Sequence, residues 1–454
     1  MNYEKIIEWA RGKGIEAEIF NLSTETMNVN IDNHRIHSIE KIKNNGYGVR
    51  VVVDGRTGFS YTTENTARAI ERCLDNAIRS AKHGKECKGF RLPDGKNIPS
   101  MKKDASKKIK DLNVETIKEH IQRLLDTVKS LNRDIFVAEG HFACGVEKTV
   151  ITNTSGLFAE WEKTAMGIFI STAYPTPEGV YVGFEEAEST DFDVDFEQIG
   201  RSAAKLAQDS KNPTKLESGR MHVILTPHAA RSILESALLT MFQGDYAMRG
   251  ESVLTGKTGK KVFAEDLTII DDGLAENTLS SMPFDDEGVP SQKNILVENG
   301  VLKQYIFDAL SAAEHGTSST GNGVRAMRLS AGRTFKNTPS PKMRNFVMRG
   351  DTRRLEEILK DYAPCLVVHA VLGAHTANPV TGDFAVNAPI VFEYSNAEFH
   401  PKRQGMLSGN IIAWLSQHVV LGNDTRKLYG TFMPTNFEMP SILIPDAQVT
   451  GSGN

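Results

Sequence analysis

The chain has few cysteines and no long apolar run. Its four cysteines among 454 residues, Cys73, Cys87, Cys144 and Cys365, are widely separated and form no C-x-x-C pair. This spacing argues against a disulfide framework and against a zinc ribbon built on thiolates. No segment approaches the ~18 apolar residues that a membrane helix requires, and the charged start MNYEKIIEWARGKG lacks the apolar region of a signal peptide. We therefore expect a cytoplasmic protein that does not span a membrane.

An excess of positive charge is also missing. The formal net charge is −4, whereas a protein that neutralises nucleic-acid phosphates carries a basic surface. Nucleic acid is therefore not an expected partner. A lysine-rich run, Lys102–Asp111, lies in a segment with Pro93, Pro99 and several glycines. We interpret it as a solvated linker rather than a binding patch, because charge runs in loops usually face water.

Two common nucleotide and hydrolase motifs do not occur. The sequence contains no G-x-x-x-x-G-K-[ST] loop and no G-x-S-x-G elbow. These motifs are the strongest sequence markers of phosphoryl transfer and of the α/β-hydrolase mechanism, respectively. Gly46 and Gly48 form a G-x-G pair, but the pair opens the strand-like run VRVVVD. A dinucleotide loop instead needs a helix N-terminus to hold the phosphates.

What is present is a long chain of ordinary globular composition, with 40% hydrophobic and 24% charged residues. The length favours two or three domains. Helices and strands are segregated along the chain rather than alternating regularly, which indicates an α+β fold. The segment KNPTKLESGR contains proline, glycine and charges, and we place a domain boundary there. We expect an α/β N-terminal domain over 1–215 and a strand-rich C-terminal domain over 216–454.

The clearest local signals are two hairpins and one buried helix. Asp54-Gly55 and Asn299-Gly300 each join two apolar runs, as tight hairpin turns do. Between 231 and 250 the apolar residues recur at helical spacing, which predicts a helix with one face in a core. Pro227 lies near its expected start, and Gly244 follows the last apolar residue, where a left-handed cap is expected.

Two groups of residues could bind a metal ion. Asp285, Asp286 and Glu287 could gather a hard cation, but the flanking Pro283 and Gly288 favour an acidic turn. His369 and His375 would share one face of an unbroken strand, although Gly373 makes that continuity doubtful. Two imidazoles without a third ligand are a weak zinc site, because even open catalytic sites use three protein ligands.

Several motifs in order resemble one family, the TldD/PmbA proteins, also called modulators of DNA gyrase. They lie in both halves of the chain and cover most of it: GYGVRVVVDGRTGFSYTT, VILTPHAARSILESALLTMFQGD, SMPFDDEGVPSQKNILVENGVLKQYIF, GTSSTGNGVR, NPVTGDF and GNDTRKLYG. The resemblance implies a two-domain fold and a role in a metallopeptidase that admits extended peptides or small unfolded proteins.

The resemblance also implies where a zinc site would lie. In the TldD branch, the helix before the Gly-Asp pair carries H-E-x-x-x-H, which supplies two zinc ligands and a general base, and a cysteine near the C-terminus completes the site. Counting back from Gly244-Asp245, the three positions in this chain are Glu235, Ser236 and Thr240. No cysteine follows GNDTRKLYG. The chain therefore resembles the TldE/PmbA branch, whose members pair with a metal-bearing TldD-like subunit.

These features predict a non-catalytic subunit that binds no metal or other cofactor itself, pairs with a zinc-bearing TldD-like chain, and helps to hold extended peptides. It could form a homodimer when alone. An alternative is a metallopeptidase active in its own right, with a relocated metal site that draws on His228, His369 or His375. A DNA gyrase or nucleic-acid regulator is a third hypothesis, which the acidic charge opposes. The segment after Gly430 matches neither branch closely and has no assigned role.

Overall fold

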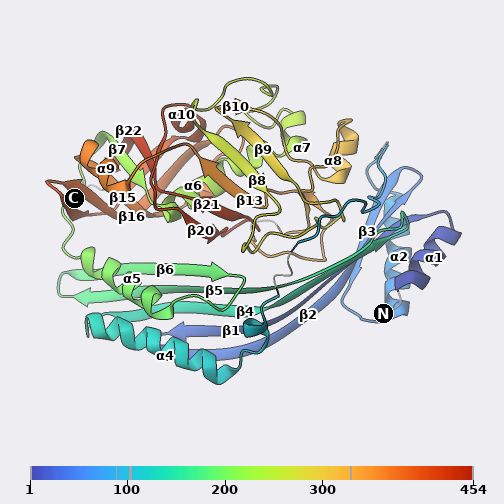
Figure 1. Cartoon of the computed structure of the whole chain (residues 1–454), viewed down its shortest axis with the longest axis horizontal. Coiled ribbons are helices and arrows are strands. Elements are labelled where there is room, and N and C mark those ends of the chain that lie inside the picture. Colours follow the sequence, from blue (N-terminus) through green and yellow to red (C-terminus); the bar gives the residue numbers. More distant parts are fainter. Residues whose placement is uncertain (1–2, 88, 102–104, 328–329, 452–454) are drawn as a thin grey trace.

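The computed structural model describes residues 3–87, 89–101, 105–327 and 330–451, and Figure 1 shows its two layers. The first part of the chain forms long strands with helices packed on them. Its elements are α1 (Tyr3–Gly12), β1 (Glu16–Asp32), β2 (Arg35–Val53), β3 (Arg56–Thr62), α2 (Ala67–Ala81), α3 (Lys107–Lys110), α4 (Val114–Leu131), β4 (Phe136–Asn153), β5 (Phe158–Thr176), β6 (Gly179–Ser189) and α5 (Phe196–Asp209).

The strands of this first half form one antiparallel sheet in the order β3-β2-β1-β4-β5-β6. Successive side chains of a strand point to opposite faces of the sheet, and β1 has buried side chains on both faces. Ile19 and Val29 are buried with helix residues on one face. Phe20 and Leu22 lie on the other face, in a cluster with residues of the second half. One strand therefore contributes to three hydrophobic clusters.

The hairpin predicted in this half is confirmed. Asp54 and Gly55 both have positive φ and join β2 to β3, with Val53 opposite Arg56. The lysine-rich run differs from the prediction. Residues 102–104 lie outside the described part of the chain, but Lys107–Lys110 forms the short helix α3 and buries Ile109 against the sheet. Ile109 packs on the sheet together with Leu112, and Ser106 donates its backbone N–H to Thr164 of β5, so this segment is docked rather than a solvated linker.

The second half begins after α5 and is mainly β-structure. Its elements are β7 (Gly219–Leu225), α6 (Pro227–Ala237), η1 (Leu239–Phe242), α7 (Gly244–Met248), β8 (Thr268–Asp272), β9 (Lys293–Glu298), β10 (Val301–Leu302), α8 (Ala309–Glu314), β11 (Gly323–Val324), β12 (Ser340–Pro341), β13 (Asn345–Arg349), β14 (Asp351–Thr352), α9 (Leu355–Asp361), β15 (Cys365–Leu372), η2 (Ala374–Thr376), β16 (Asp383–Ser395), β17 (Glu398–Lys402), β18 (Gly405–Asn410), α10 (Ile411–Leu415), β19 (Val420–Leu421), β20 (Arg426–Tyr429), β21 (Asn436–Met439) and β22 (Ile442–Gly451). The α+β class is confirmed.

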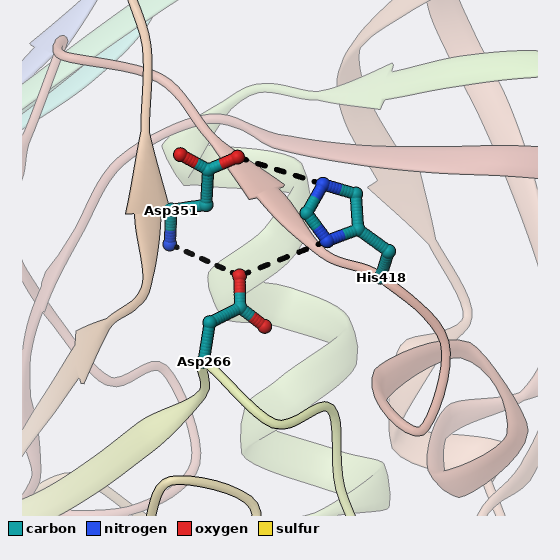
Figure 2. Close-up of side chains that lie close together, drawn as sticks. All are labelled: Asp266, Asp351 and His418. Atoms are coloured by element: carbon teal, nitrogen blue, oxygen red, sulfur yellow. Dashed lines mark hydrogen bonds and ion pairs between the residues drawn. The ribbon is translucent and has the colours of Figure 1, made fainter.

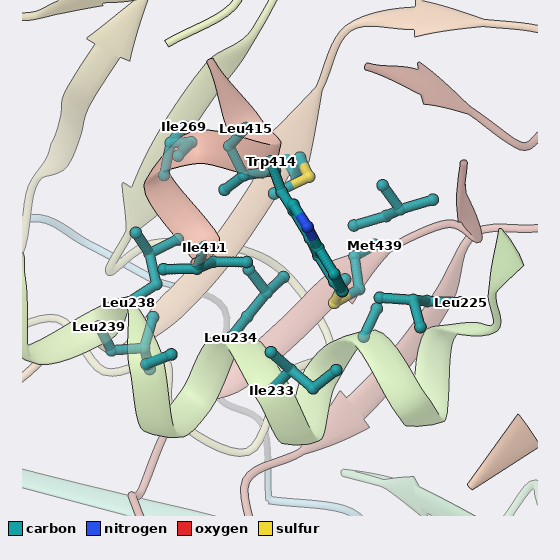
Figure 3. Close-up of a cluster of buried hydrophobic side chains, with 14 of the residues drawn as sticks. Leu225, Ile233, Leu234, Leu238, Leu239, Ile269, Ile411, Trp414, Leu415 and Met439 are labelled. Atoms are coloured by element: carbon teal, nitrogen blue, oxygen red, sulfur yellow. The ribbon is translucent and has the colours of Figure 1, made fainter. Parts of the chain in front are cut away.

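Two sheets of this half surround helix α6. Strands β7, β15, β16, β18 and β22 form a closed ring because β22 also pairs with β7, and a second sheet has the order β10-β9-β8-β13-β21-β20. Helix α6 contributes Ile233 and Leu234 to a core that includes Leu225 of β7 and Met439 of β21 (Figure 3). The helix is therefore central, as its periodicity predicts, and burial of each such leucine contributes about 1.5–3 kcal/mol.

The predicted hairpin at Asn299-Gly300 is confirmed, with Val301 opposite Glu298 and positive φ at both turn residues. The glycine is needed for a second reason. A Cβ at Gly300 would lie 2.5 Å from the backbone oxygen of Phe263, so no other residue fits without movement of the backbone.

The two halves meet at the glycine pair of β2. A Cβ at Gly46 would lie 2.2 Å from the ring of Phe335, and one at Gly48 would lie 2.6 Å from the backbone oxygen of Phe335. These glycines therefore allow a loop of the second half to approach the sheet of the first. Their G-x-G spacing reflects this close packing rather than a phosphate site.

A buried ion network crosses the same junction. Glu18 of β1 is fully buried and contacts two arginines, Arg50 of β2 at 2.8 Å and Arg325 of the second half. Arg50 also binds Glu287 at 2.6 Å. Two carboxylates and two guanidinium groups from both halves therefore neutralise one another out of contact with water.

The acidic turn of Asp285, Asp286 and Glu287 belongs to this network. A turn is confirmed at these residues, with Gly288 at φ +80°, but all three side chains are buried. Asp286 pairs with Arg333, which also contacts Glu147 of β4. Burial alone would raise the pKa of Glu147, but Lys163 and Arg333 lower it to about 2. Arginine side chains therefore pair with Asp286 and Glu287, whereas the carboxylate of Asp285 accepts hydrogen bonds from the backbone N–H groups of Glu287, Val289 and Gly323.

No helix among the described residues is long and apolar enough to cross a membrane.

The ion network should be a major determinant of stability. Glu18→Gln keeps the shape of the side chain but leaves two buried arginines short of a counter-charge, and breaking such a buried pair costs about 3–5 kcal/mol. We expect a large drop in the urea midpoint of unfolding. The control is Glu64→Gln, which removes an exposed ion pair with Arg72 and should leave the midpoint almost unchanged. Equal effects of the two substitutions would contradict this account.

Candidate functional site

Helix α6 and the 3-10 helix η1 that follows it hold the three positions that the family resemblance singles out. It follows β7, which pairs in parallel with β15, and it begins with Pro227 at its first turn. The helix predicted from near Pro227 up to Gly244 does not run unbroken, because α6 ends at Ala237 and the 3-10 helix η1 follows it. Gly244 does not form a left-handed cap. It begins α7, and a Cβ there would lie 2.0 Å from the ring of Phe307.

Glu235 has a definite structural role. Its carboxylate is fully buried and accepts hydrogen bonds from three consecutive backbone N–H groups, those of Thr431 at 3.1 Å and of Phe432 and Met433 at 2.8 Å. Burial raises the pKa of Glu235, and the three N–H groups oppose that rise. The loop that follows GNDTRKLYG is thus held against α6 by one side chain.

Ser236 and Thr240 make no comparable arrangement. Both are half-buried, but Ser236 lies on α6 whereas Thr240 lies in η1. Zinc in proteins is held by thiolates, imidazoles and carboxylates, and of the three positions only Glu235 offers such a group. Its two oxygens already bind the loop. The residues present at these positions therefore do not fit a zinc ion.

The histidines of the alternative hypothesis are only partly brought together. His228 and His369 line one cavity, together with Glu185 and Arg426. His375 lies elsewhere, in η2 beyond Gly373, and its ring packs on Phe432 at 5.8 Å. The left-handed Gly373, with φ +87°, ends the strand as its sequence suggests.

The cavity has a volume of about 780 Å³ and lies between the two halves. Its wall from the first half comes from β6 and α5, and its opposite wall from the second half. Nε2 of His228 lies 3.4 Å from Glu185, whose carboxylate also pairs with Arg426 at 2.9 Å. Burial would raise the pKa of Glu185, but His228 and Arg426 lower it to about 2. Desolvation lowers the pKa of His369 to about 4, so this imidazole is neutral near pH 7.

Three acidic residues of β6 form a row that begins at this cavity: Glu185, Glu186 and Glu188. Glu186 pairs with Arg231 of α6 at 2.8 Å, and Arg231 also donates to the backbone oxygen of Tyr429. Burial and the neighbouring Glu186 raise the pKa of Glu188 to about 8. These residues were not singled out from the sequence, although the run GFEEAES, three acids within a strand, was an available signal.

Among the described residues, one group of three possible metal ligands has its ligand atoms within 4.8 Å of one another: Asp266, Asp351 and His418 (Figure 2). The imidazole lies between the two carboxylates, with Nδ1 3.8 Å from Asp266 and Nε2 3.5 Å from Asp351. A metal would take one nitrogen, whereas both face a carboxylate here. The side chain of His418 is also 64% exposed. This arrangement is that of a surface ion pair.

The chain matches three models of one family: PmbA/TldA metallopeptidase domain 1 over 17–81, the central domain over 107–211 and the C-terminal domain over 218–451. It is 30% identical to an uncharacterized protein of Methanocaldococcus jannaschii, over 93% of this chain and 95% of that protein. It is 25% identical to a metalloprotease TldD homolog of Buchnera aphidicola, over 90% and 86%.

Among solved structures, the chain is similar to TldE from Thermococcus kodakarensis. The TM-score is 0.91 with 23% sequence identity, and the match covers 99% of this chain and 100% of that one. At this level of identity the similarity shows a shared fold.

Glu235 should stabilise the 431–433 loop, and Ser236 should not. Glu235→Gln replaces one acceptor oxygen by an NH₂ group that faces backbone donors, and an unsatisfied buried donor costs about 1–3 kcal/mol. We expect faster amide hydrogen exchange at Thr431, Phe432 and Met433 and a lower urea midpoint. Ser236→Ala should change neither. The account is contradicted if exchange in this loop is the same in both variants.

Glu188 should make stability fall as the pH rises. Its pKa is about 8 in the folded chain, whereas an exposed glutamate has a pKa of about 4.5, so between these values the unfolded chain releases a proton that the folded chain retains. The amide in Glu188→Gln does not titrate, so this variant does not lose stability in this way as the pH rises. Its stability advantage over the wild type should grow from pH 4.5 to pH 8, to on the order of 3–5 kcal/mol, in urea titrations. The exposed Glu139→Gln should show no such trend, and a trend of equal size there would disprove the assignment.

Proposed function

The chain belongs to the PmbA/TldD metallopeptidase family, and on that premise we propose that it is the non-catalytic TldE/PmbA-like subunit of a zinc peptidase complex. In this complex a TldD-like subunit supplies the zinc, and the substrates are extended peptides and small unfolded proteins. The observation that carries the proposal is what the carboxylate of Glu235 binds. At the position of the first ligand, a carboxylate binds the backbone of the loop that would carry the third.

The retained helix supports this proposal. Ile233 and Leu234 of α6 are almost fully buried in the central core, so the helix is needed for folding whether or not it binds metal. The ligand positions are not part of this apolar core, since Ser236 is half-buried and the carboxylate of Glu235 binds the 431–433 loop instead. A chain with an intact fold and altered ligand positions suits a partner that shapes and holds a complex but performs no chemistry.

The experiment is reconstitution. The purified chain is assayed for hydrolysis of unfolded peptides alone, and after mixing with a TldD-like chain that carries H-E-x-x-x-H. We expect no chelator-sensitive cleavage by the chain alone, and co-elution with the partner together with chelator-sensitive cleavage by the mixture. The matched control is a partner whose motif glutamate is changed to glutamine, which should co-elute without activity. Chelator-sensitive cleavage by the chain alone would refute the proposal.

A second candidate is a metallopeptidase that is active in its own right. It is favoured by one observation, that His228 and His369 line the same cavity. Among the described residues, however, these histidines belong to no group of three ligands within 4.8 Å. His228→Ala, His369→Ala and His375→Ala distinguish the candidates. If the chain alone shows activity and none of the three substitutions reduces it, the relocated site is excluded.

A further inference from the structure

We propose that the cavity between the two halves binds apolar side chains of an extended peptide whose main chain lies along the outer edge of β6. This inference rests on the proposed function, because it gives the non-catalytic subunit a substrate-holding site of its own. The cavity is about 780 Å³, within the range of sites that enclose a ligand and larger than one side chain needs.

The walls of the cavity are largely apolar. Ile224 and Val367 come from the parallel strands β7 and β15, Leu355 and Leu359 from α9, and Leu206 from α5. Aromatic rings border it on both sides. The rings of Phe184 and His228 meet edge to face at 5.4 Å, and those of His369 and Phe392 do so at the same distance. Such surfaces favour aliphatic and aromatic side chains.

The outermost ring is Phe399 of β17. It lines the cavity but is 52% exposed, and its ring lies 6.4 Å from that of Phe392. A bound apolar group would cover this ring and remove it from water. The exposure of Phe399 also makes it a suitable position for mutation, because its side chain contributes less to the folded core than the inner residues do.

The charges around the cavity are already paired within the chain. Glu185 binds Arg426, Lys205 binds Asp209 at 2.7 Å, and the carboxylate of Asp424 accepts hydrogen bonds from Ser441. The neutral His369 adds no charge. A charged ligand side chain would lose its hydration without gaining a free partner, so the cavity should select neutral apolar side chains.

The edge of β6 supplies a place for the main chain. β6 is the last strand in the order of its sheet, so a further strand could pair with its outer side, as in strand addition, except at Glu186, whose backbone oxygen accepts a hydrogen bond from Arg426. Val180 and Val182 are 65% and 42% exposed, and Phe184 continues the same alternating row into the cavity. A strand added here would carry every second side chain toward the cavity.

The test uses the full chain without a partner and fluorescein-labelled peptides of about ten residues, in which glycine and serine surround either phenylalanines or aspartates. Fluorescence anisotropy should show that the phenylalanine peptide binds at least about tenfold more tightly than the aspartate peptide. A phenylalanine peptide with alternate N-methylated amides should lose at least about tenfold in affinity if the main chain pairs with β6.

Two protein variants locate the site. Phe399→Ser should weaken binding of the phenylalanine peptide by about tenfold. Phe158→Ser, which removes a ring that is 63% exposed on β5 and lies outside the cavity, should not. The proposal is overturned if the wild type does not prefer the phenylalanine peptide, if N-methylation has no effect, or if Phe399→Ser binds like the wild type. Because no partner is present, these outcomes are independent of whether the proposed complex assembles.

Discussion

The structure depends on the burial of Glu18 between two arginines. This carboxylate lies on the face of β1 opposite the helices and binds Arg50 from its own sheet and Arg325 from the second half. Removing these charges from water is costly unless each is paired, so the network is satisfied only when both halves are docked. That docking fixes β6 and α5 opposite α6 and β15, and it thereby forms the cavity and the charge pairs that line it.

A second constraint explains how the fold accommodates the residues at the positions that the family resemblance singles out. α6 is held by its apolar face, whereas Glu235 fastens the 431–433 loop through three backbone hydrogen bonds. Backbone N–H groups that are buried need acceptors, and the carboxylate meets this need without a metal. The loop and the helix therefore keep their mutual position although neither an imidazole nor a thiolate is present at this contact.

Local patterns predicted much of the fold. The hairpin turns at Asp54-Gly55 and Asn299-Gly300 were predictable because their backbone geometry is set by adjacent residues. The role of Gly244 was not, because Phe307, far along the chain, occupies the space beside it. Nor did the sequence reveal that the acidic turn is buried, since its arginine partners are distant in sequence. In the candidate site, counting from Gly244-Asp245 located Glu235, but its loop partners and the acidic row on β6 are visible only in three dimensions. The division at residue 215 and the metal-free state stay predictions.

The zinc content of the chain, purified alone without metal-affinity steps, tests the central claim most directly. A non-catalytic subunit whose former ligand position binds its own backbone should contain almost no zinc after mild dialysis. About one tightly held zinc per chain would contradict the account, because such affinity requires several protein ligands, and an intrinsic metallopeptidase would then be the better description.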